Sequence, residues 1–298
     1  MERCRIAAVQ VRTRRQDVAH NLAEHVRVID AAATAGCDLV VFPELSVTGH
    51  NGSVEVIRDA EPLDGPIAAQ LTARAAECGV VVGYGFCEAF RGTHYNTYAL
   101  VGPEGLLGVQ RKVHASFDEF FRFRQAYEWN VTDVGPFRAG VAICHDSDFF
   151  ESWRILALRG AEVVLLPHAR RKLFAADGTL RFDGAAHEAS PEDLLAAQRS
   201  FLDPATVPPR LQDVLARDNG VYAVYADHVG FDGHSTHVGG AFVLGPDGST
   251  VASSEPGLDT SWIVAELDPA LLARVRENPV FPLRKRRPET YDELTLPL

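Results

Sequence analysis

The chain has 298 residues, which suits one large domain or two ordinary ones and leaves ample length for a buried core. Its 40 acidic and 29 basic residues give a net charge of -11, which argues against a general nucleic-acid or anionic-membrane surface and is compatible with a soluble enzyme. The N-terminus shows no apolar stretch long enough for a signal peptide or a membrane span, and the five cysteines form no Cys-x-x-Cys pair, so we expect a cytoplasmic protein with free thiols.

Short apolar runs alternate with segments of helical periodicity through the first half of the chain. A strand is predicted over residues 6–11, and a helix follows through Leu22, Val26 and Ile29. The next predicted elements are a strand over 39–42, a helix over 67–76, and strands over 80–86, 98–101 and 106–112. This order predicts a β-α-β opening that continues into further strands.

The same alternation returns in the second half of the chain. The predicted elements are strand 141–143, helix 151–159, strand 163–166, helix 210–218, and strands 221–226, 241–244, 250–252 and 262–267. No linker rich in Pro, Gly or Ser separates the halves, so we expect one α/β domain over residues 1–268. The remainder, residues 269–298, is rich in proline after a short helix, and we expect it to pack on the body or on a partner subunit.

One segment, residues 170–209, departs from this rhythm. It is polar, contains two Asp-Gly turns and has a single helical stretch over 191–201. Because long ordered loops are often functional, it forms either a lid or entrance wall at a site, or a surface excursion without a role in the reaction.

Three reactive side chains stand in the order Glu44, Lys112 and Cys144, and the first and last of them follow short, fully apolar runs. Ligands of α/β sheets gather beyond the carboxyl ends of such strands. A thiol becomes a useful nucleophile when a base takes its proton and a cation holds the charge that develops on the attacked oxygen. Taken singly, these residues are typical of an inert core thiol, a solvated glutamate and an exposed lysine, so their local sequences decide the interpretation.

Those local sequences resemble the nitrilase superfamily, the carbon-nitrogen hydrolases. Segments 42–49 (FPELSVTG), 111–114 (RKVH) and 143–146 (ICHD) are similar to the family's F-P-E-x-x-x-x-G, R-K-x-H and I-C-x-D segments. Segment 156–167 is similar to the helix and strand that follow the nucleophile in this family. Four separated motifs in the correct order form a specific signal, and the resemblance covers nearly the whole chain.

The resemblance implies a four-layer α-β-β-α sandwich that hydrolyses a small amide or N-carbamoyl compound. Glu44 then acts as general base, Cys144 attacks the carbonyl carbon, and Lys112 stabilises the tetrahedral intermediate. A thioester acyl-enzyme forms, and water activated by the same carboxylate releases the acid. The amidase and carbamoylase branches are favoured over nitrilases proper, which usually carry tryptophan where this chain has His145.

Further site residues follow from the same resemblance. Glu119 matches a glutamate that many members carry after the lysine, and we expect it to orient Lys112 and the substrate, with a surface glutamate as the other interpretation. His145, Phe149 and His168 are expected to contact the substrate, and the backbone N-H of His145 is the expected second oxyanion donor.

Other functions stay open at this point. An acyl or amide transferase could use the same acyl-enzyme, a nitrilase is a further alternative, and a binding protein could have the fold without turnover. His234 and His237 are spaced so that they could bind a metal, but their Gly-rich loop supplies no further ligands, so we expect neither a metal nor a nucleotide cofactor. The expected partners are a small-molecule substrate and a second copy of the chain in a homodimer or larger homo-oligomer, with no nucleic acid and no membrane.

Overall fold

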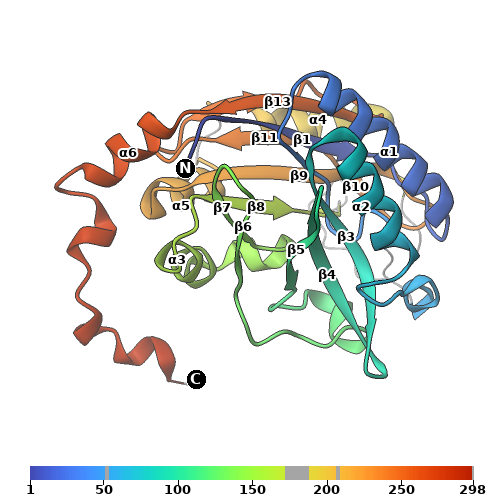
Figure 1. The fold of residues 1–298 in the computed structure, drawn as a ribbon, viewed down its shortest axis with the longest axis horizontal. Helices are drawn as coiled ribbons and strands as arrows, with labels where there is room; N and C mark the ends of the chain where they lie inside the picture. Colours follow the sequence, from blue (N-terminus) through green and yellow to red (C-terminus); the bar gives the residue numbers. More distant parts are fainter. Residues whose placement is uncertain (51–53, 172–187, 206–208, 297–298) are drawn as a thin grey trace.

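The computed structural model describes residues 1–50, 54–171, 188–205 and 209–296 (Figure 1). The strands of the first half are β1 (Cys4–Val11), β2 (Leu39–Val41), β3 (Val81–Phe90), β4 (Thr93–Gly102) and β5 (Gly105–Arg111). Those of the second half are β6 (Val131–Asp133), β7 (Arg138–Val141), β8 (Val163–Pro167), β9 (Tyr222–Phe231), β10 (Thr236–Val238), β11 (Ala241–Leu244), β12 (Thr250–Ser253) and β13 (Ser261–Leu267). The α-helices are α1 (Val18–Thr34), α2 (Pro66–Cys78), α3 (Phe150–Leu158), α4 (Pro191–Leu202), α5 (Leu211–Asn219) and α6 (Pro269–Glu277).

Short 3-10 helices occupy several of the connections. They are η1 (Val54–Asp59), η2 (Phe117–Phe121), η3 (Cys144–Asp148), η4 (Pro282–Lys285), η5 (Pro288–Thr290) and η6 (Asp292–Thr295). No helix that the structure describes combines the length and the apolar character needed to cross a membrane.

The strands form one continuous hydrogen-bonded path in the order β5-β4-β3-β2-β1-β9-β8-β7-β6. Strands β1, β2 and β3 are parallel to one another, as are β7, β8 and β9. A short parallel contact between β1 and β9 joins the two groups, and β13 and β11 add antiparallel partners to β1 and β9. The two parallel groups therefore meet at the centre of the path, with their carboxyl ends close together.

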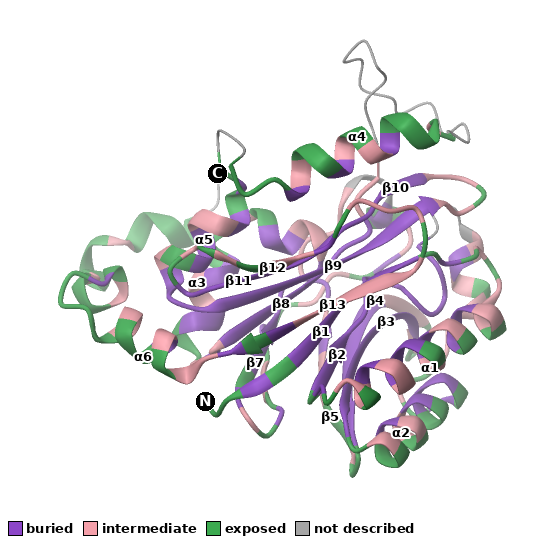
Figure 2. Cartoon of the chain, turned by 90° about the horizontal axis from the view of Figure 1, so that it is seen from above, coloured by how far each residue is buried: buried purple, intermediate pink, exposed green. Residues whose placement is uncertain are grey.

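Three layers of buried side chains show how the sheets and helices stack. One layer lies between β1–β4 and helices α1 and α2, and another lies between β7, β8, β9 and β11 and helices α3, α4 and α5. The third fills the space between the two sheet halves. Figure 2 shows the buried strands in the middle, with α1 and α2 on one side and α3 and α5 on the other. The expected α-β-β-α sandwich is confirmed.

Strand β8 illustrates why a short apolar run forms a strand in this fold. Val163 and Leu165 point into the layer between the sheets, whereas Val164 and Leu166 point toward the helices. Successive side chains of a strand face opposite sides, so a strand buried on both faces needs an unbroken apolar run.

Helix boundaries follow local signals in the sequence. Asp17 accepts a hydrogen bond from the backbone N-H of His20 and begins α1. Pro66 occupies the first position of α2, and Gly79 ends this helix with a left-handed φ of 68°. These residues fix the lengths of the helices that cover the first sheet.

The predicted strands and helices are found with boundaries shifted by a few residues, and one prediction needs correction. The strand expected over 141–143 ends at Val141, because the chain turns at Ile143 and begins η3 at Cys144. Strands β6 and β10, each three residues long, were not predicted. Within residues 170–209 the predicted helix is α4, and both predicted Asp-Gly turns lie outside the described residues.

Candidate active site

The three reactive residues predicted from the sequence lie just beyond strand ends. Glu44 follows β2 by three residues, Lys112 follows β5 directly, and Cys144 follows β7 by three residues. Because β2 and β7 belong to the two parallel groups that meet at the centre of the sheet path, Glu44 and Cys144 approach from opposite halves of the fold. The topology therefore brings together residues that are far apart in sequence.

The ammonium group of Lys112 lies between two buried carboxylates. Its Nζ is 2.6 Å from Oε1 of Glu44 and 2.8 Å from Oε2 of Glu119. Asn96, on β4, donates from Nδ2 to the same Oε1 of Glu44 at 2.7 Å and to Oε1 of Glu119 at 3.1 Å. Ser116 donates to Glu119 from its backbone N-H and its hydroxyl, each at 2.7 Å. Every one of these charges is therefore held by several hydrogen bonds.

The two carboxylates differ in their pKa values because their partners differ. Burial raises the pKa of Glu44 above its ordinary value, and this effect together with the nearby charge of Glu119 outweighs the opposing effect of Lys112. Burial acts in the same direction on Glu119, but Lys112 and the Ser116 donors bring the pKa of Glu119 below its ordinary value. Burial lowers the pKa of Lys112, but the two carboxylates raise it well above its ordinary value. Lys112 and Glu119 are therefore charged at neutral pH, and Glu44 is the more basic carboxylate.

Cys144 stands on a strained turn beside these groups. Its φ of 49° lies in the left-handed region, which non-glycine residues rarely adopt. Burial and then the charge of Glu44 raise the pKa of its thiol well above the ordinary value, while Lys112 and the backbone N-H of Ala169, which donates to the sulfur, act in the opposite direction. The sulfur is therefore a thiol at rest and needs a base in order to react.

An oxygen of Glu44 is left free to serve as that base. Its Oε1 accepts from Lys112 and Asn96, but its Oε2 is buried and has no hydrogen-bond partner among the described residues. A buried carboxylate oxygen without a donor is costly unless it receives one during function. Glu44 thus offers a basic oxygen, and its charge acts on the Cys144 thiol.

Asp146 connects the segment after Lys112 with the turn that carries Cys144. Its Oδ1 accepts from the backbone N-H of His114 at 2.7 Å and from the His114 ring at 2.9 Å. Its Oδ2 accepts from the backbone N-H groups of Val113 at 3.3 Å and Ile143 at 3.2 Å. The two short motifs around residues 112 and 144 are therefore joined by a single buried carboxylate.

A cavity of about 380 Å³ opens at Cys144. His145 and His168, both predicted to contact substrate, contribute to its lining, and His168 also bonds the hydroxyl of Ser147 through Nε2 at 3.0 Å. Phe149 is not among the described lining residues, and its ring stacks on that of His114 with the centroids 4.0 Å apart. The structure thus places two of the three expected contact residues at the cavity and the third outside its described lining.

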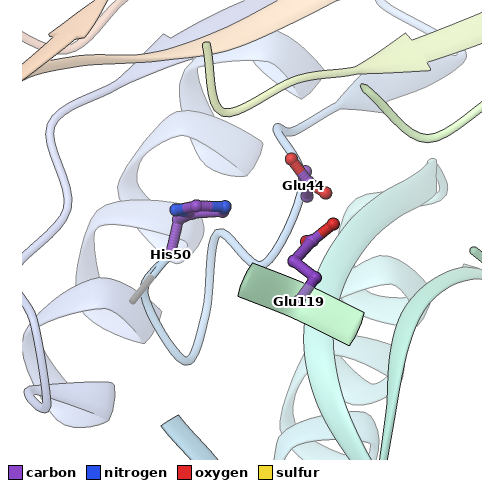
Figure 3. Close-up of side chains that lie close together, drawn as sticks. All are labelled: Glu44, His50 and Glu119. Carbon is purple, nitrogen blue, oxygen red and sulfur yellow. The ribbon is translucent and has the colours of Figure 1, made fainter. Parts of the chain in front are cut away.

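His50 is a site residue that sequence reasoning missed. It lines the same cavity, and one of its ring nitrogens lies within 4.8 Å of an oxygen of Glu44 and an oxygen of Glu119 (Figure 3). Burial and then the charge of Arg171 lower the pKa of His50 well below its ordinary value, so its imidazole is neutral. The only signal in the sequence was its position, because His50 directly follows Gly49, the last residue of the 42–49 motif.

The set of Glu44, His50 and Glu119 has the ligand types of a divalent-metal site. The ammonium of Lys112 already lies within hydrogen-bonding distance of both carboxylates, however, so a metal ion there would compete with Lys112 for the same oxygens. His237, considered as a metal ligand from the sequence, instead bonds Oδ2 of Asp232 at 3.1 Å. The donor set suits the lysine better than a metal.

Asn96 was also missed, although it bridges both carboxylates. It lies within β4, and both of its carboxylate partners, Glu44 and Glu119, are many residues away in sequence. Asparagine is depleted in strands, so its presence between Tyr95 and Thr97 was the available signal.

Comparisons with known proteins show what the whole chain is similar to. The sequence model of a family described as carbon-nitrogen hydrolase matches residues 5–277. A protein of Pseudomonas protegens named "Hydrolase in pqqF 5'region" is 32% identical, over 98% of this chain and 92% of the relative. A nitrilase of Pyrococcus abyssi is 30% identical, over 96% of this chain and 98% of the relative. An (R)-stereoselective amidase of Pseudomonas sp. is 29% identical, over 92% of this chain and 88% of the relative.

A similar solved structure is a variant of the amidase from Nesterenkonia sp. AN1. It superposes with a TM-score of 0.76 at 23% identity, covering 98% of this chain and 97% of the other. That crystal structure shows covalent addition of the acetamide moiety of fluoroacetamide at the active site cysteine of the amidase. At this level of identity the likeness concerns the fold.

Proposed function

The chain belongs to the carbon-nitrogen hydrolase family, and from this membership and the geometry around Cys144 we propose that it hydrolyses the carbon-nitrogen bond of a small linear amide or N-carbamoyl compound. The observation that carries the proposal is the buried Oε2 of Glu44, which has no hydrogen-bond partner among the described residues and belongs to a carboxylate whose charge acts on the Cys144 thiol. The relatives are named both as an amidase and as a nitrilase, and His145, where nitrilases proper usually carry tryptophan, favours an amide over a nitrile as substrate.

The first half of the reaction forms a thioester. Oε2 of Glu44 takes the proton of the Cys144 thiol as the sulfur bonds to the carbonyl carbon, and negative charge passes to the carbonyl oxygen. Lys112 and the backbone N-H of His145, at the start of η3, are the donors proposed to hold that oxygen. The protonated Glu44 then gives its proton to the nitrogen, the carbon-nitrogen bond breaks, and ammonia or an amine leaves.

The second half returns the enzyme to its starting state. Glu44 takes a proton from water as the water oxygen attacks the thioester carbon, and the carbon-sulfur bond breaks to release the acid. The sulfur leaves as a thiolate, which recovers the proton held by Glu44. Glu119 stays anionic throughout, because Lys112 and Ser116 hold it, and it keeps Lys112 charged and in place.

The proposal predicts that turnover depends on Cys144 and on no other cysteine. Cys144→Ala should lower ammonia release from a panel of small amides by at least about 10³-fold, because the nucleophile is lost. Cys78→Ala is the matched control, since Cys78 is also partly accessible but lies at the end of α2. Intact-mass measurement with fluoroacetamide should show an adduct on the wild type and on Cys78→Ala, but not on Cys144→Ala.

Two results would contradict the proposal. Turnover by Cys144→Ala within tenfold of the wild type would exclude Cys144 as the nucleophile. Transfer of the acyl group of an amide substrate to added amines, with no free acid formed under any condition, would instead identify an acyl transferase.

A further inference from the structure

We propose that the substrate carries a carboxylate and that the guanidinium of Arg170 binds it. This inference rests on the proposed function, because it concerns the cavity at Cys144, and it narrows the substrate to small anionic amides. Arg170 lines that cavity and directly follows Ala169, whose backbone N-H donates to the Cys144 sulfur. A group bound by Arg170 is therefore held next to the reacting carbon.

The backbone of Arg170 is fixed on both sides. Its N-H donates to Oδ1 of buried Asp227 at 2.9 Å, and its carbonyl accepts from the N-H of Val238 at 3.1 Å. The guanidinium lies over the ring of Phe201 in α4, with Cζ 3.3 Å from the ring centroid. Stacking on an aromatic face leaves the edge of the guanidinium, with its N-H donors, open for a ligand.

The Arg170 guanidinium forms no salt bridge with a described residue, although its charge opposes the rise that burial causes in the pKa of Asp227. Its Nε is shielded from solvent and makes no hydrogen bond within the described part of the chain. Asp227 does not form a salt bridge through both its oxygens with this guanidinium. Its Oδ1 accepts from the Arg170 backbone N-H, and its Oδ2 accepts from the hydroxyl of Tyr225 at 2.9 Å. Shielded charges are normally paired, and a planar guanidinium fits a carboxylate with two parallel hydrogen bonds.

Arginines outnumber acidic side chains among the described residues that line the cavity. Arg171 and Arg210 line it together with Arg170, whereas Asp148 is the acidic residue of the described lining and is bonded to His145 at 2.9 Å. Arg210 is buried, Asp213 accepts from its Nε, and its Nη1 has no hydrogen-bond partner among the described residues. On a chain with a net charge of -11, a basic cavity favours anionic substrates and disfavours cationic ones.

The carboxylate has two chemical sources that one experiment can separate. It belongs either to the acyl part, as in a monoamide of a dicarboxylic acid, or to the leaving amine, as in an N-carbamoyl amino acid. The first pair of substrates is succinamate and neutral butyramide, with 4-aminobutanamide as the cationic analogue. The second pair is N-carbamoyl-β-alanine and neutral N-propylurea. In at least one pair we expect kcat/KM of the wild type to be about 10- to 100-fold higher for the anion.

Substitution of Arg170 assigns this preference to one residue. Arg170→Gln should lower kcat/KM for the preferred anion by about 10- to 100-fold and leave that of its neutral analogue within about threefold. Arg170→Lys should recover part of the loss, because it keeps the charge without the planar fork. Arg27→Gln is the control, since Arg27 is exposed on α1 and pairs with Glu24, and it should change neither value.

Each outcome decides between the two proposals. Equal kcat/KM for anion and neutral analogue in both pairs, or a preference that survives in Arg170→Gln, would overturn the carboxylate inference while neutral-amide turnover upholds the proposed function. If the wild type turns over none of these substrates, the proposed function itself is contradicted. Should Arg170→Gln fail to fold, wild-type inhibition serves instead: glutarate must inhibit butyramide hydrolysis competitively and more strongly than 1,5-pentanediol, and equal inhibition overturns the inference.

Discussion

Two glutamates share the ammonium group of Lys112, yet their pKa values move in opposite directions. Glu119 receives three hydrogen bonds from Lys112 and Ser116 on a single oxygen, Oε2, whereas Glu44 keeps its Oε2 free. When the environments of two carboxylates separate their pKa values, the more basic one is suited to proton transfer and the other to holding charge. This separation explains why two chemically identical side chains are proposed for different roles.

The pH dependence of the reaction tests this separation. Only the carboxylate form of Glu44 accepts the thiol proton, so kcat/KM should fall as the pH decreases through the pKa of Glu44, which is raised above 4.5. The charge of Glu119 contributes to that rise, so Glu119→Gln should move the acid limb of the profile to lower pH. The same variant should lower kcat by about 10- to 100-fold. Lys112 then loses one of its two carboxylate partners and is no longer held in place.

A remote glutamate provides the control for this experiment. Glu77 is exposed on α2 and pairs with Arg74, so Glu77→Gln should leave both kcat and the acid limb unchanged. An acid limb that stays in place or moves to higher pH in Glu119→Gln would contradict the proposed coupling between the two carboxylates. The alkaline limb should not arise from Lys112 below pH 10.5, because its pKa is raised above that value.

At the scale of elements, the segment that carries Glu44 rests directly on strand β3. A Cβ atom built on Gly85 would lie 2.2 Å from the backbone nitrogen of Leu45, and the N-H of Val47 donates to the Gly85 carbonyl at 3.0 Å. Leu45 has a φ of 48°, so the turn after Glu44 is strained and is held by this close approach. Gly85 therefore positions a residue on another element without touching the cavity.

Gly85→Ala should disturb stability and chemistry together. The added methyl group meets backbone that cannot move without displacing Glu44, so we expect a loss of about 2 kcal/mol or more in the free energy of unfolding and a lower kcat. Gly257→Ala is the matched control, because its Cβ would meet its nearest neighbour, Nε2 of Gln10, at 3.8 Å. Urea unfolding and initial rates on both variants measure these effects, and similar values for the two would show that the contact at Gly85 has no consequence.

The elements that carry the site could be predicted from the sequence, but their contacts could not. The apolar runs before Glu44 and Cys144 predict strands, so the position of both residues shortly after a strand follows from the local sequence. The bond from Asn96 to Glu44 joins residues 52 positions apart, and the four bonds of Asp146 join two separate turns. Such pairings depend on strand order and register, which periodicity does not encode.

At the scale of the whole molecule, the two-sheet arrangement also exceeds what periodicity can show. An unbroken apolar run such as Val163 to Leu166 predicts a strand buried on both faces, but it does not say whether each face meets a helix or another sheet. In this fold one face meets helices and the other meets the second sheet half. Only the resemblance of the separated motifs predicted four layers, and the site depends on this arrangement because its residues come from both halves.

The tail after α6 divides into a part that packs on the body and a part that extends beyond it (Figure 1). Phe281 is buried, and its ring would lie 2.5 Å from a Cβ built on Gly220 at the end of α5. Farther along, Leu294 and Leu296 are 69% and 65% exposed. Apolar side chains on an extended tail are typical of a contact with another chain, so we propose that residues 287–296 pack against a second copy of this protein.

Removal of residues 287–298 tests the role of the tail. Because the described part of this segment is largely exposed, the truncated chain should unfold with a free energy within about 0.5 kcal/mol of the full chain at protein concentrations where both are monomeric. Phe281→Ala should cost about 3 kcal/mol under the same conditions, because it leaves a cavity beside α5. Sedimentation velocity at higher concentration should show a dimer or larger oligomer for the full chain and for Glu77→Gln, and a smaller species for the truncated chain.

Equal sedimentation of full and truncated chains would mean that the exposed end of the tail does not hold the copies together. Any association would then have to come from the surfaces of the four layers.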